Sequence, residues 1–148
     1  VLHGVSMGAA TVLMASGEDL PGNVKAVIAD CGYTSEWDEF QREADTLHIP
    51  WFPVLNATSV LSKIRDGYDF KQASALAQVK KSRIPTLFIH GSSDELVPYS
   101  MLGELYAAAA CEKEELTVEG AGHALSSSVA PTLYWRTVED FIAKYLDR

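Results

Sequence analysis

Short apolar segments alternate along this chain with longer segments of helical pattern. The apolar segments are typical of buried parallel strands, and they fall at residues 1–3, 24–29, 86–90 and 115–118. Helices are expected at residues 6–16, 35–46, 59–66, 69–81, 98–111 and 131–146. This alternation predicts an α/β fold with a mostly parallel sheet and flanking helices.

Two segments depart from a simple repeat of strand and helix. Residues 48–55 read HIPWFPVL, and their two prolines argue against a regular helix or a central strand there. The last helix carries an apolar and aromatic face at helical spacing, which predicts packing against the sheet. That face comprises Tyr134, Trp135, Val138, Phe141, Ile142 and Tyr145.

The negative net charge of the chain argues against nucleic acids and anionic membranes as partners. The 148 residues carry a formal net charge of -8, whereas nucleic acids and anionic membranes require clustered Lys and Arg. We therefore expect no nucleic-acid partner. No apolar run approaches the roughly 20 residues of a membrane span, and no signal peptide is visible. The chain opens without Met inside an apolar segment, which we take as a boundary within a longer protein, so the sequence leaves its compartment undetermined.

The cysteines and histidines indicate no metal centre. Cys31 and Cys111 lie among apolar residues outside any C-x-x-C pair, and we expect two reduced, packed thiols. Their redox state also leaves the compartment open. The histidines lack the i, i+4 pairing of common zinc motifs, and no phosphate-binding loop is present. We expect neither a metal nor a cofactor.

The pentapeptide at residues 4–8, GVSMG, matches G-x-S-x-G. In this motif the serine lies on a strained turn between a strand and a helix, so that its hydroxyl projects above the sheet. Here the motif follows a strand and opens an apolar helix, so Ser6 is the candidate nucleophile. The helix start directs backbone N–H groups at the site, and the Met7 N–H is a candidate oxyanion donor. The alternative is an ordinary Gly-Ser turn before a buried helix.

A serine nucleophile needs a base, and four histidines are available. His123 lies in the Gly-rich loop that follows the last strand, from which an imidazole can reach back over the sheet edge. His3 and His90 lie at strand ends and are expected to be structural. His48, in the Pro-rich segment, lines a pocket or faces water. We therefore select His123.

The base in turn needs a carboxylate that orients it. Asp94 follows the strand at residues 86–90, at the carboxyl end where open α/β sheets bind ligands. The order Ser6, Asp94, His123 is the order that α/β-hydrolases use. Asp30 also ends a strand and remains the rival acid, unless it bonds the turn that follows it. Glu95 is expected to be a solvated loop charge.

With these motifs in place, the chain resembles the α/β-hydrolase superfamily over essentially all of its length. The shared features are the elbow, the segments DCGYTS at residues 30–35 and IHGSSD at residues 89–94, the Val97-Pro98 pair and the GAGH loop at residues 120–123. Within the superfamily it is similar to bacterial hydrolases described as cell-surface or putative serine esterases and peptidases. The resemblance implies one partial domain over residues 1–148, the C-terminal part of the hydrolase fold.

The resemblance also implies a cap-like insertion at about residues 35–81, over the active site. Trp51 and Phe52, with their apolar neighbours, would then form a wall for an acyl or aromatic substrate group, or else pack the cap onto the sheet. Tyr33, after a strand end, is a further candidate substrate-binding residue.

In the fold that the chain resembles, the loop after the third strand supplies a second oxyanion N–H, and no such loop precedes the elbow in these 148 residues. We expect the missing N-terminal half of the protein to be a partner, and an open sheet edge invites self-association. A membrane anchor in that half would make the protein extracellular; otherwise it is cytoplasmic. We expect the isolated chain to have weak or no activity.

The expected activity is hydrolysis of a small-molecule acyl ester through an acyl-enzyme intermediate on Ser6. A peptidase or thioesterase of the same fold is the nearest alternative. A non-catalytic α/β domain that keeps the elbow for packing or ligand binding remains the other alternative.

Overall fold

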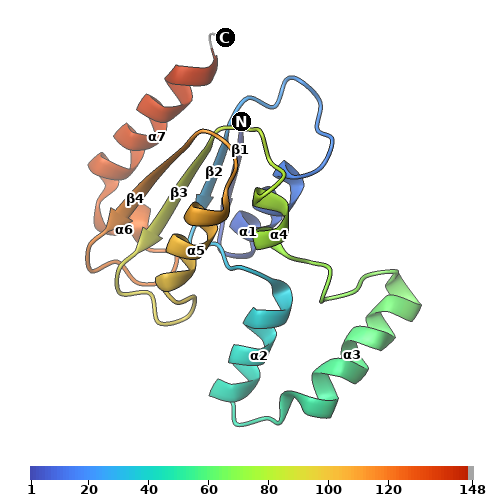
Figure 1. Cartoon of the computed structure of the whole chain (residues 1–148). Coiled ribbons are helices and arrows are strands. Elements are labelled where there is room, and N and C mark those ends of the chain that lie inside the picture. Colours follow the sequence, from blue (N-terminus) through green and yellow to red (C-terminus); the bar gives the residue numbers. More distant parts are fainter. Residues whose placement is uncertain (147–148) are drawn as a thin grey trace.

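The computed structural model describes residues 1–146, arranged as a parallel sheet between helices (Figure 1). The strands are β1 (Leu2–Val5), β2 (Val27–Asp30), β3 (Thr86–Gly91) and β4 (Lys113–Val118). The helices are α1 (Met7–Ser16), α2 (Glu36–Thr46), α3 (Trp51–Asp66), α4 (Ala75–Val79), α5 (Ser100–Ala108), α6 (Ser126–Val129) and α7 (Pro131–Leu146).

The four strands pair in parallel in their chain order, β1-β2-β3-β4. Within this sheet, Ala29 of β2 lies opposite Gly4 of β1 and Phe88 of β3. Because every strand runs the same way, all four carboxyl ends meet at one edge of the sheet. This confirms the α/β class with a mostly parallel sheet.

Two apolar layers cover the two faces of the sheet, because successive side chains of a strand point to opposite faces. Val27 and Phe88 face α1, α4 and α5, whereas Ile28 and Leu87 face α7 (Figure 1). The central strands β2 and β3 are buried along their whole length. The three-layer arrangement explains why these strands read as continuous apolar runs rather than as alternating ones.

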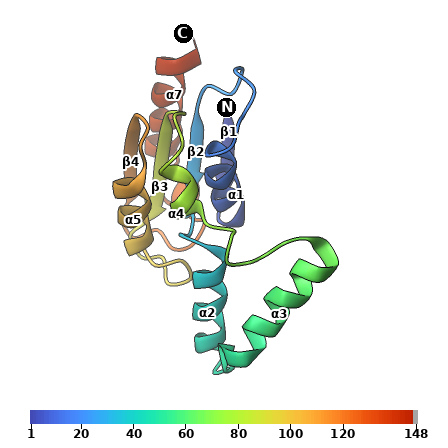
Figure 2. The same cartoon turned by 45° about the vertical axis from the view of Figure 1, so that its right-hand side comes forward.

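Helices α2 and α3 extend away from the sheet, beyond the carboxyl ends of the strands, as Figures 1 and 2 both show. The segments that enter and leave this region lie side by side at its base. There Ser35 forms a β-bridge with Ser74, and the Leu76 N–H donates to the Thr34 carbonyl. We call α2 and α3 the cap. In contrast, α4 packs on α1 in the main body. The prediction of a single partial domain over residues 1–148 with a cap-like insertion at 35–81 stays a prediction. The last two of these residues lie outside the described part.

The segment at residues 48–55 is not a regular helix, as expected, but α3 extends into it with a kink at Phe52. Helix α3 begins at Trp51, well before the predicted start at residue 59. Its one non-helical residue is Phe52, with φ -99° and ψ 129°, which is the extended conformation that a following proline favours. Pro53 is tolerated because the first turn of a helix has no intrahelical acceptor for the missing N–H. The helix ends, as predicted, at Gly67, which adopts φ 72°.

Three smaller differences concern the last two helical regions and α4. Helix α4 covers only residues 75–79 because Asp69 holds the preceding residues in a turn, accepting the Lys71 N–H. The short α6 escaped prediction because Ser-rich segments carry no apolar periodicity. On α7, Trp135 is 48% exposed, so that residue was wrongly assigned to the buried face, whereas Tyr134, Val138, Phe141 and Tyr145 are buried.

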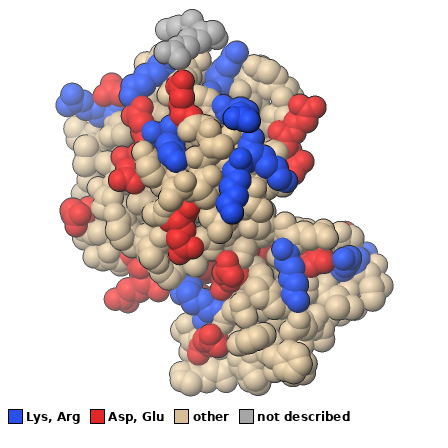
Figure 3. Space-filling view, viewed as in Figure 1, with Lys and Arg blue, Asp and Glu red and all other residues tan. Residues whose placement is uncertain are grey.

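The surface differs between the sheet body and the cap. Acidic and basic side chains are interspersed over the body, and much of the cap surface carries no charge (Figure 3). Several large apolar side chains are exposed there: Leu47, Ile49, Phe52, Val54, Val60, Leu61 and Ile64. Among the described residues, no helix has the length and apolar character that crossing a membrane requires.

Candidate active site

The turn between β1 and α1 holds Ser6 in a strained conformation. Ser6 has φ 55° and ψ -119°, a region that non-glycine residues occupy only at a cost of about 1–3 kcal/mol. The Ser6 N–H donates to the Asp30 carbonyl at 2.8 Å, which ties the turn to the end of β2. The hydroxyl is therefore presented at the carboxyl edge of the sheet, as the G-x-S-x-G motif predicts.

The two glycines of the motif are not equivalent. A Cβ on Gly4 would collide with the backbone of Gly8, whereas a Cβ on Gly8 would meet no described atom. Of the two glycines, only Gly4 is therefore needed for the close approach of β1 and α1. The sheet strand and the helix touch at this point through backbone alone.

His123 lies over Ser6, in the loop between β4 and α6. The loop is held against the end of β3, because the Ser93 N–H donates to the Ala121 carbonyl at 3.0 Å. A Cβ on Gly91 would collide with that same carbonyl, so β3 must end in glycine here. This packing brings His123 Nε2 to 2.7 Å from Ser6 Oγ.

Asp94 holds the other side of the imidazole. Its Oδ2 lies 2.9 Å from His123 Nδ1, and its Oδ1 accepts the N–H groups of Leu96 and Val97 at 3.0 and 2.9 Å. Because a carboxylate only accepts, Nδ1 carries the proton and Nε2 is left to accept the Ser6 hydroxyl. The Asp94 side chain is fully buried, and that of His123 is 19% exposed. The structure thus brings together the three residues that the sequence selected as a triad.

The rival histidines lie away from Ser6 Oγ. His90 is buried, and its Nε2 lies 3.0 Å from the Val97 carbonyl and 3.2 Å from Asp94 Oδ2. It therefore supports Asp94 from behind, as a structural histidine. His3 bonds Tyr134 through its Nε2 at 3.0 Å, and His48 is exposed in the connection between α2 and α3.

Asp30, the rival acid, points to the other face of the sheet. Its Oδ1 accepts the Ser126 hydroxyl at 3.0 Å, and Tyr134 also bonds its carboxyl group. Burial raises the pKa of this carboxyl group, against the smaller opposite effects of these hydrogen bonds. Asp30 therefore joins β2 to α6 and α7 instead of holding His123.

The candidate oxyanion donor begins α1. Met7 is the first residue of this helix, and the first N–H groups of a helix have no intrahelical acceptor. The Met7 side chain is 67% exposed, so only its backbone is positioned for a role at the site. Its function as an oxyanion donor stays a prediction.

The predicted substrate-binding residues occupy different places. Tyr33 is only 5% exposed and packs on Ala10, Val97 and Met101, while its hydroxyl donates to Glu36 Oε1 at 2.8 Å. It therefore connects the core to the base of the cap. Trp51 and Phe52 lie at the start of α3, 37% and 67% exposed. Their role in substrate binding stays a prediction.

The cap forms an open apolar pocket of about 290 Å³ between α2 and α3. Its lining is almost wholly apolar: Phe40, Ala44, Leu47, Ile49, Trp51, Val54, Leu55, Thr58 and Phe70. Trp51 lines this pocket, whereas Phe52 does not. A pocket of this size and character suits an alkyl or aromatic group.

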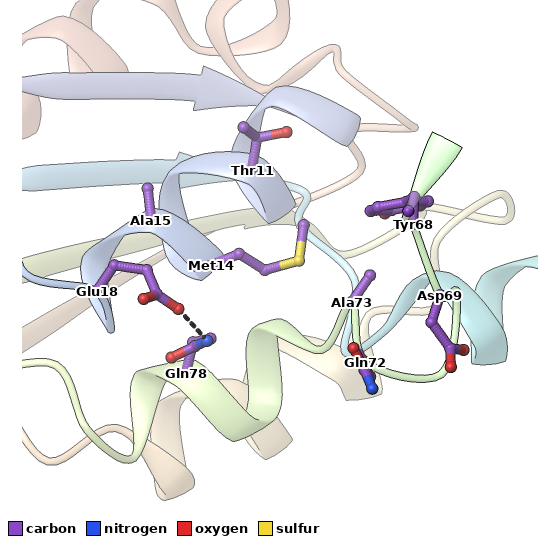
Figure 4. A pocket seen from close by; sticks show the side chains of 10 residues that line it. Thr11, Met14, Ala15, Glu18, Tyr68, Asp69, Gln72, Ala73 and Gln78 are labelled. Carbon is purple, nitrogen blue, oxygen red and sulfur yellow. Dashed lines mark hydrogen bonds between the residues drawn. The ribbon is translucent and has the colours of Figure 1, made fainter. Parts of the chain in front are cut away.

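A larger pocket, of about 400 Å³, lies between α1 and the segment that joins α3 to α4 (Figure 4). Met14, Tyr68 and Gln72 are among its lining residues, and Gln78 donates to Glu18 Oε1 across one end at 2.6 Å. No triad residue lines it. Its position on the outer side of α1 separates it from the chemistry at the sheet edge.

The prediction from the sequence did not include two further residues, Glu39 and Cys31, as part of the site. Glu39 of α2 is half-buried, and this burial raises its pKa, while Arg42 and, least of all, His123 lower it. Cys31 is fully buried beside Asp94 and His123. Cys31 follows a strand end as Asp94 does, so the rule that found Asp94 could have found it, whereas no sequence signal marks Glu39.

Comparison with known proteins gives one family. The model of the prolyl oligopeptidase family matches residues 1–148. The uncharacterized protein YqkD of Bacillus subtilis (strain 168) is 32% identical over 144 residues, which cover 95% of this chain and 47% of that protein. The chain therefore spans about half the length of this curated relative.

Solved structures share the fold at low sequence identity. The esterase domain of a Rhodothermus marinus protein matches with a TM-score of 0.64 and 20% identity, over 97% of this chain and 59% of that one. The acylaminoacyl peptidase of Pyrococcus horikoshii matches with a TM-score of 0.70 and 16% identity, over 99% of this chain and 24% of that one. The esterase Pf2001 of Pyrococcus furiosus matches with a TM-score of 0.71 and 19% identity, over 97% of this chain and 52% of that one. These likenesses show an α/β-hydrolase fold.

Proposed function

The chain belongs to the prolyl oligopeptidase family of α/β-hydrolases, and from this premise we propose that it hydrolyses carboxylic esters through an acyl-enzyme on Ser6. The observation that carries the proposal is the continuous hydrogen-bonded series of Ser6, His123 and Asp94, with separations of 2.7 and 2.9 Å. Family membership supports serine hydrolysis, and the ester substrate is our proposal.

In the proposed mechanism His123 Nε2 takes the proton of the Ser6 hydroxyl as Oγ attacks the carbonyl carbon. The imidazolium that forms is stabilised by the buried Asp94 carboxylate, to which Nδ1–H donates. His123 then gives its proton to the leaving alkoxide, and the acyl group remains on Ser6. A water that His123 deprotonates hydrolyses this acyl-enzyme and regenerates the serine.

The negative charge on the attacked oxygen requires preorganised donors. We assign one donor to the Met7 N–H, at the positive end of the α1 dipole. A second donor in this fold comes from the loop after the third strand. Since the loss of one donor costs about 10²–10³ in turnover, the isolated chain is expected to work well below the rate of a longer protein that supplies it.

The cap pocket supports an ester with an apolar acyl or aromatic group. Helix α2 contributes Phe40 to the lining of this pocket of about 290 Å³, and no triad residue lines it. That the acyl group of the substrate enters it is part of the proposal. Neither a cofactor nor a metal enters the proposed reaction.

Peptide hydrolysis is the second candidate, and the name of the matching family favours it. The same triad cleaves amides and esters by the same steps. A panel of matched acyl esters and acyl-peptides distinguishes the two: the proposal requires ester turnover to exceed that of the peptide with the same acyl group by more than their difference in intrinsic reactivity.

The test of the mechanism is covalent labelling with a fluorophosphonate, which needs an activated serine and no knowledge of the substrate. We expect labelling at Ser6, with a rate that falls about 10²–10⁴-fold in His123→Asn because the general base is lost. His48→Asn, which changes an exposed histidine, is the matched control and should label normally. Equal labelling of both variants, or labelling at another serine, would refute the mechanism.

A further inference from the structure

A thiol lies among the three residues of the triad. Cys31 Sγ, an Asp94 carboxylate oxygen and a His123 ring nitrogen all lie within 4.8 Å of one another. Burial raises the pKa of this thiol to about 12, while the backbone N–H groups of Ala124 and Ser6 lower it to a smaller extent. A bound dication would have to offset this effect of burial, because a metal favours the thiolate.

These three groups form a ligand set suited to one kind of ion. A thiolate, an imidazole and a carboxylate bind Zn²⁺ at about 2.0–2.3 Å, which places the ligand atoms of a tetrahedral site about 3.3–3.8 Å apart. Asp94 Oδ2 and His123 Nδ1, now 2.9 Å apart, would move slightly apart, and the separations that reach up to 4.8 Å would shorten by a little more than about 1 Å. Magnesium and calcium prefer all-oxygen sites and do not match the sulfur ligand.

The charges also balance. Cys31 loses its thiol proton to solvent on coordination, so the thiolate and the Asp94 carboxylate neutralise the two charges of the ion, while His123 binds as neutral imidazole. A net-neutral cluster lowers the cost of placing a dication in a buried position. The partly exposed side chain of His123 leaves one side of the cluster open to an entering ion and to a fourth, water ligand.

We propose that Cys31, Asp94 and His123 form a Zn²⁺ site whose occupancy switches off the triad. This would be regulation of the Ser6, His123 and Asp94 triad, and it rests on the proposed ester hydrolysis. If the ion binds Nδ1, the remaining ring proton resides on Nε2, which can no longer accept the Ser6 proton. Because Asp94 Oδ2 lies at Nδ1, Nδ1 is the ring nitrogen that the ion would bind, and the triad then loses its general base.

Zinc titration calorimetry on the unlabelled chain tests the site itself. We expect one Zn²⁺ per chain, with an affinity at least about 100-fold weaker in Cys31→Ser, since even removing a residue behind a ligand costs 10–100-fold. Cys111→Ser is the matched control: Cys111 is also a free cysteine, but it bonds Thr86 at the start of β3, at the opposite end of the sheet. Equal binding by Cys31→Ser and the wild type overturns the proposal.

Two further measurements separate failure of the site from failure of the proposed function. Zn²⁺ should block fluorophosphonate labelling of Ser6, EDTA should restore it, and Mg²⁺ at the same concentration should leave it unchanged; inhibition by Mg²⁺ overturns the proposal. If the metal-free chain never labels, the proposed function fails, and the calorimetry still decides the site. Should Cys31→Ser not fold, Co²⁺ added to the wild type must give a thiolate-to-cobalt absorption band, and its absence is equally decisive.

Discussion

At the scale of single residues, the chemistry of this chain is set by positions at the ends of strands. Ser6, Asp94 and His123 could be selected from the sequence because each follows a strand of a parallel sheet, whose carboxyl ends meet at one edge. Cys31 follows a strand end in the same way, whereas Glu39 could not be selected, since it lies on a helix of the cap. The sequence lists neighbours along the chain and gives no contacts across it.

The unequal glycines of the elbow lead to a paired prediction. Gly4→Ala forces a Cβ into the backbone of Gly8, and overpacking of this kind costs about 1–3 kcal/mol. Gly8→Ala adds a methyl group in open space within the first turn of α1, so stability should stay equal or rise by up to about 1 kcal/mol. Urea unfolding of both variants measures the difference, and a similar loss in each would contradict the geometry.

The buried Asp30 predicts a specific dependence of stability on pH. Its pKa is raised by burial above the ordinary value of 3.8, so the folded chain binds more protons than the unfolded chain between the two values. Its contribution to stability is therefore complete below pH 3.8 and is lost as the pH rises through the higher, folded value.

Asp30→Asn removes this titration. We expect the variant to lack the decline in stability over that interval, when unfolding by urea is followed against pH. Asp140→Asn, on the exposed side of α7, is the control and should keep the decline. A wild type whose curve runs parallel to that of Asp30→Asn would show that burial does not perturb this carboxyl group.

At the scale of elements, the sheet and α2 were predictable from the sequence, whereas the start of α3 and the cap pocket were not. Short apolar runs predict buried parallel strands, and β2, β3 and β4 lie within a few residues of the predicted ranges. The start of α3 was missed because Pro53 was read as a helix breaker, although a first turn accepts it. The cap pocket lies between α2 and α3, which meet only in the folded chain. No local sequence pattern therefore predicts this pocket.

The cap pocket gives a test with two adjacent aromatic residues. Trp51→Ala removes part of the pocket wall, so the preference for long or aromatic acyl esters over acetyl esters should fall by about 10–100-fold, the discrimination that apolar contacts of this size provide. Phe52→Ala, outside the lining, should leave the preference unchanged. Relative kcat/KM for a series of esters measures it. Lower stability of Trp51→Ala with an unaltered preference would instead mean that Trp51 packs the cap.

At the scale of the whole molecule, the described sheet has two edge strands, β1 and β4. β1 is an edge strand among the described residues, and Val1 and Val5 are 44% and 43% exposed there. The curated relative is about twice as long as this chain. We propose that further strands of a longer protein pair with β1, an interaction that no sequence pattern within these 148 residues could specify.

An unpaired edge of this kind favours association of the isolated chain. We expect a solution mass above that of a monomer, which Val5→Lys should lower, because a charge on an edge strand opposes strand pairing. Val129→Lys places the same charge at an equally exposed valine away from that edge. Light scattering compares the three proteins. A monomeric wild type, or the same decrease in both variants, would contradict the role of β1.

The end of the sheet opposite the cap holds no residue of the proposed chemistry. The connection from α1 to β2 turns there, and Gly22 is exposed with open space around its backbone. Peptide insertions succeed best at exposed, polar loop tips. An affinity handle or a fluorescent reporter spliced in after Gly22 would therefore let the protein be immobilised or tracked while substrates reach the cap side freely.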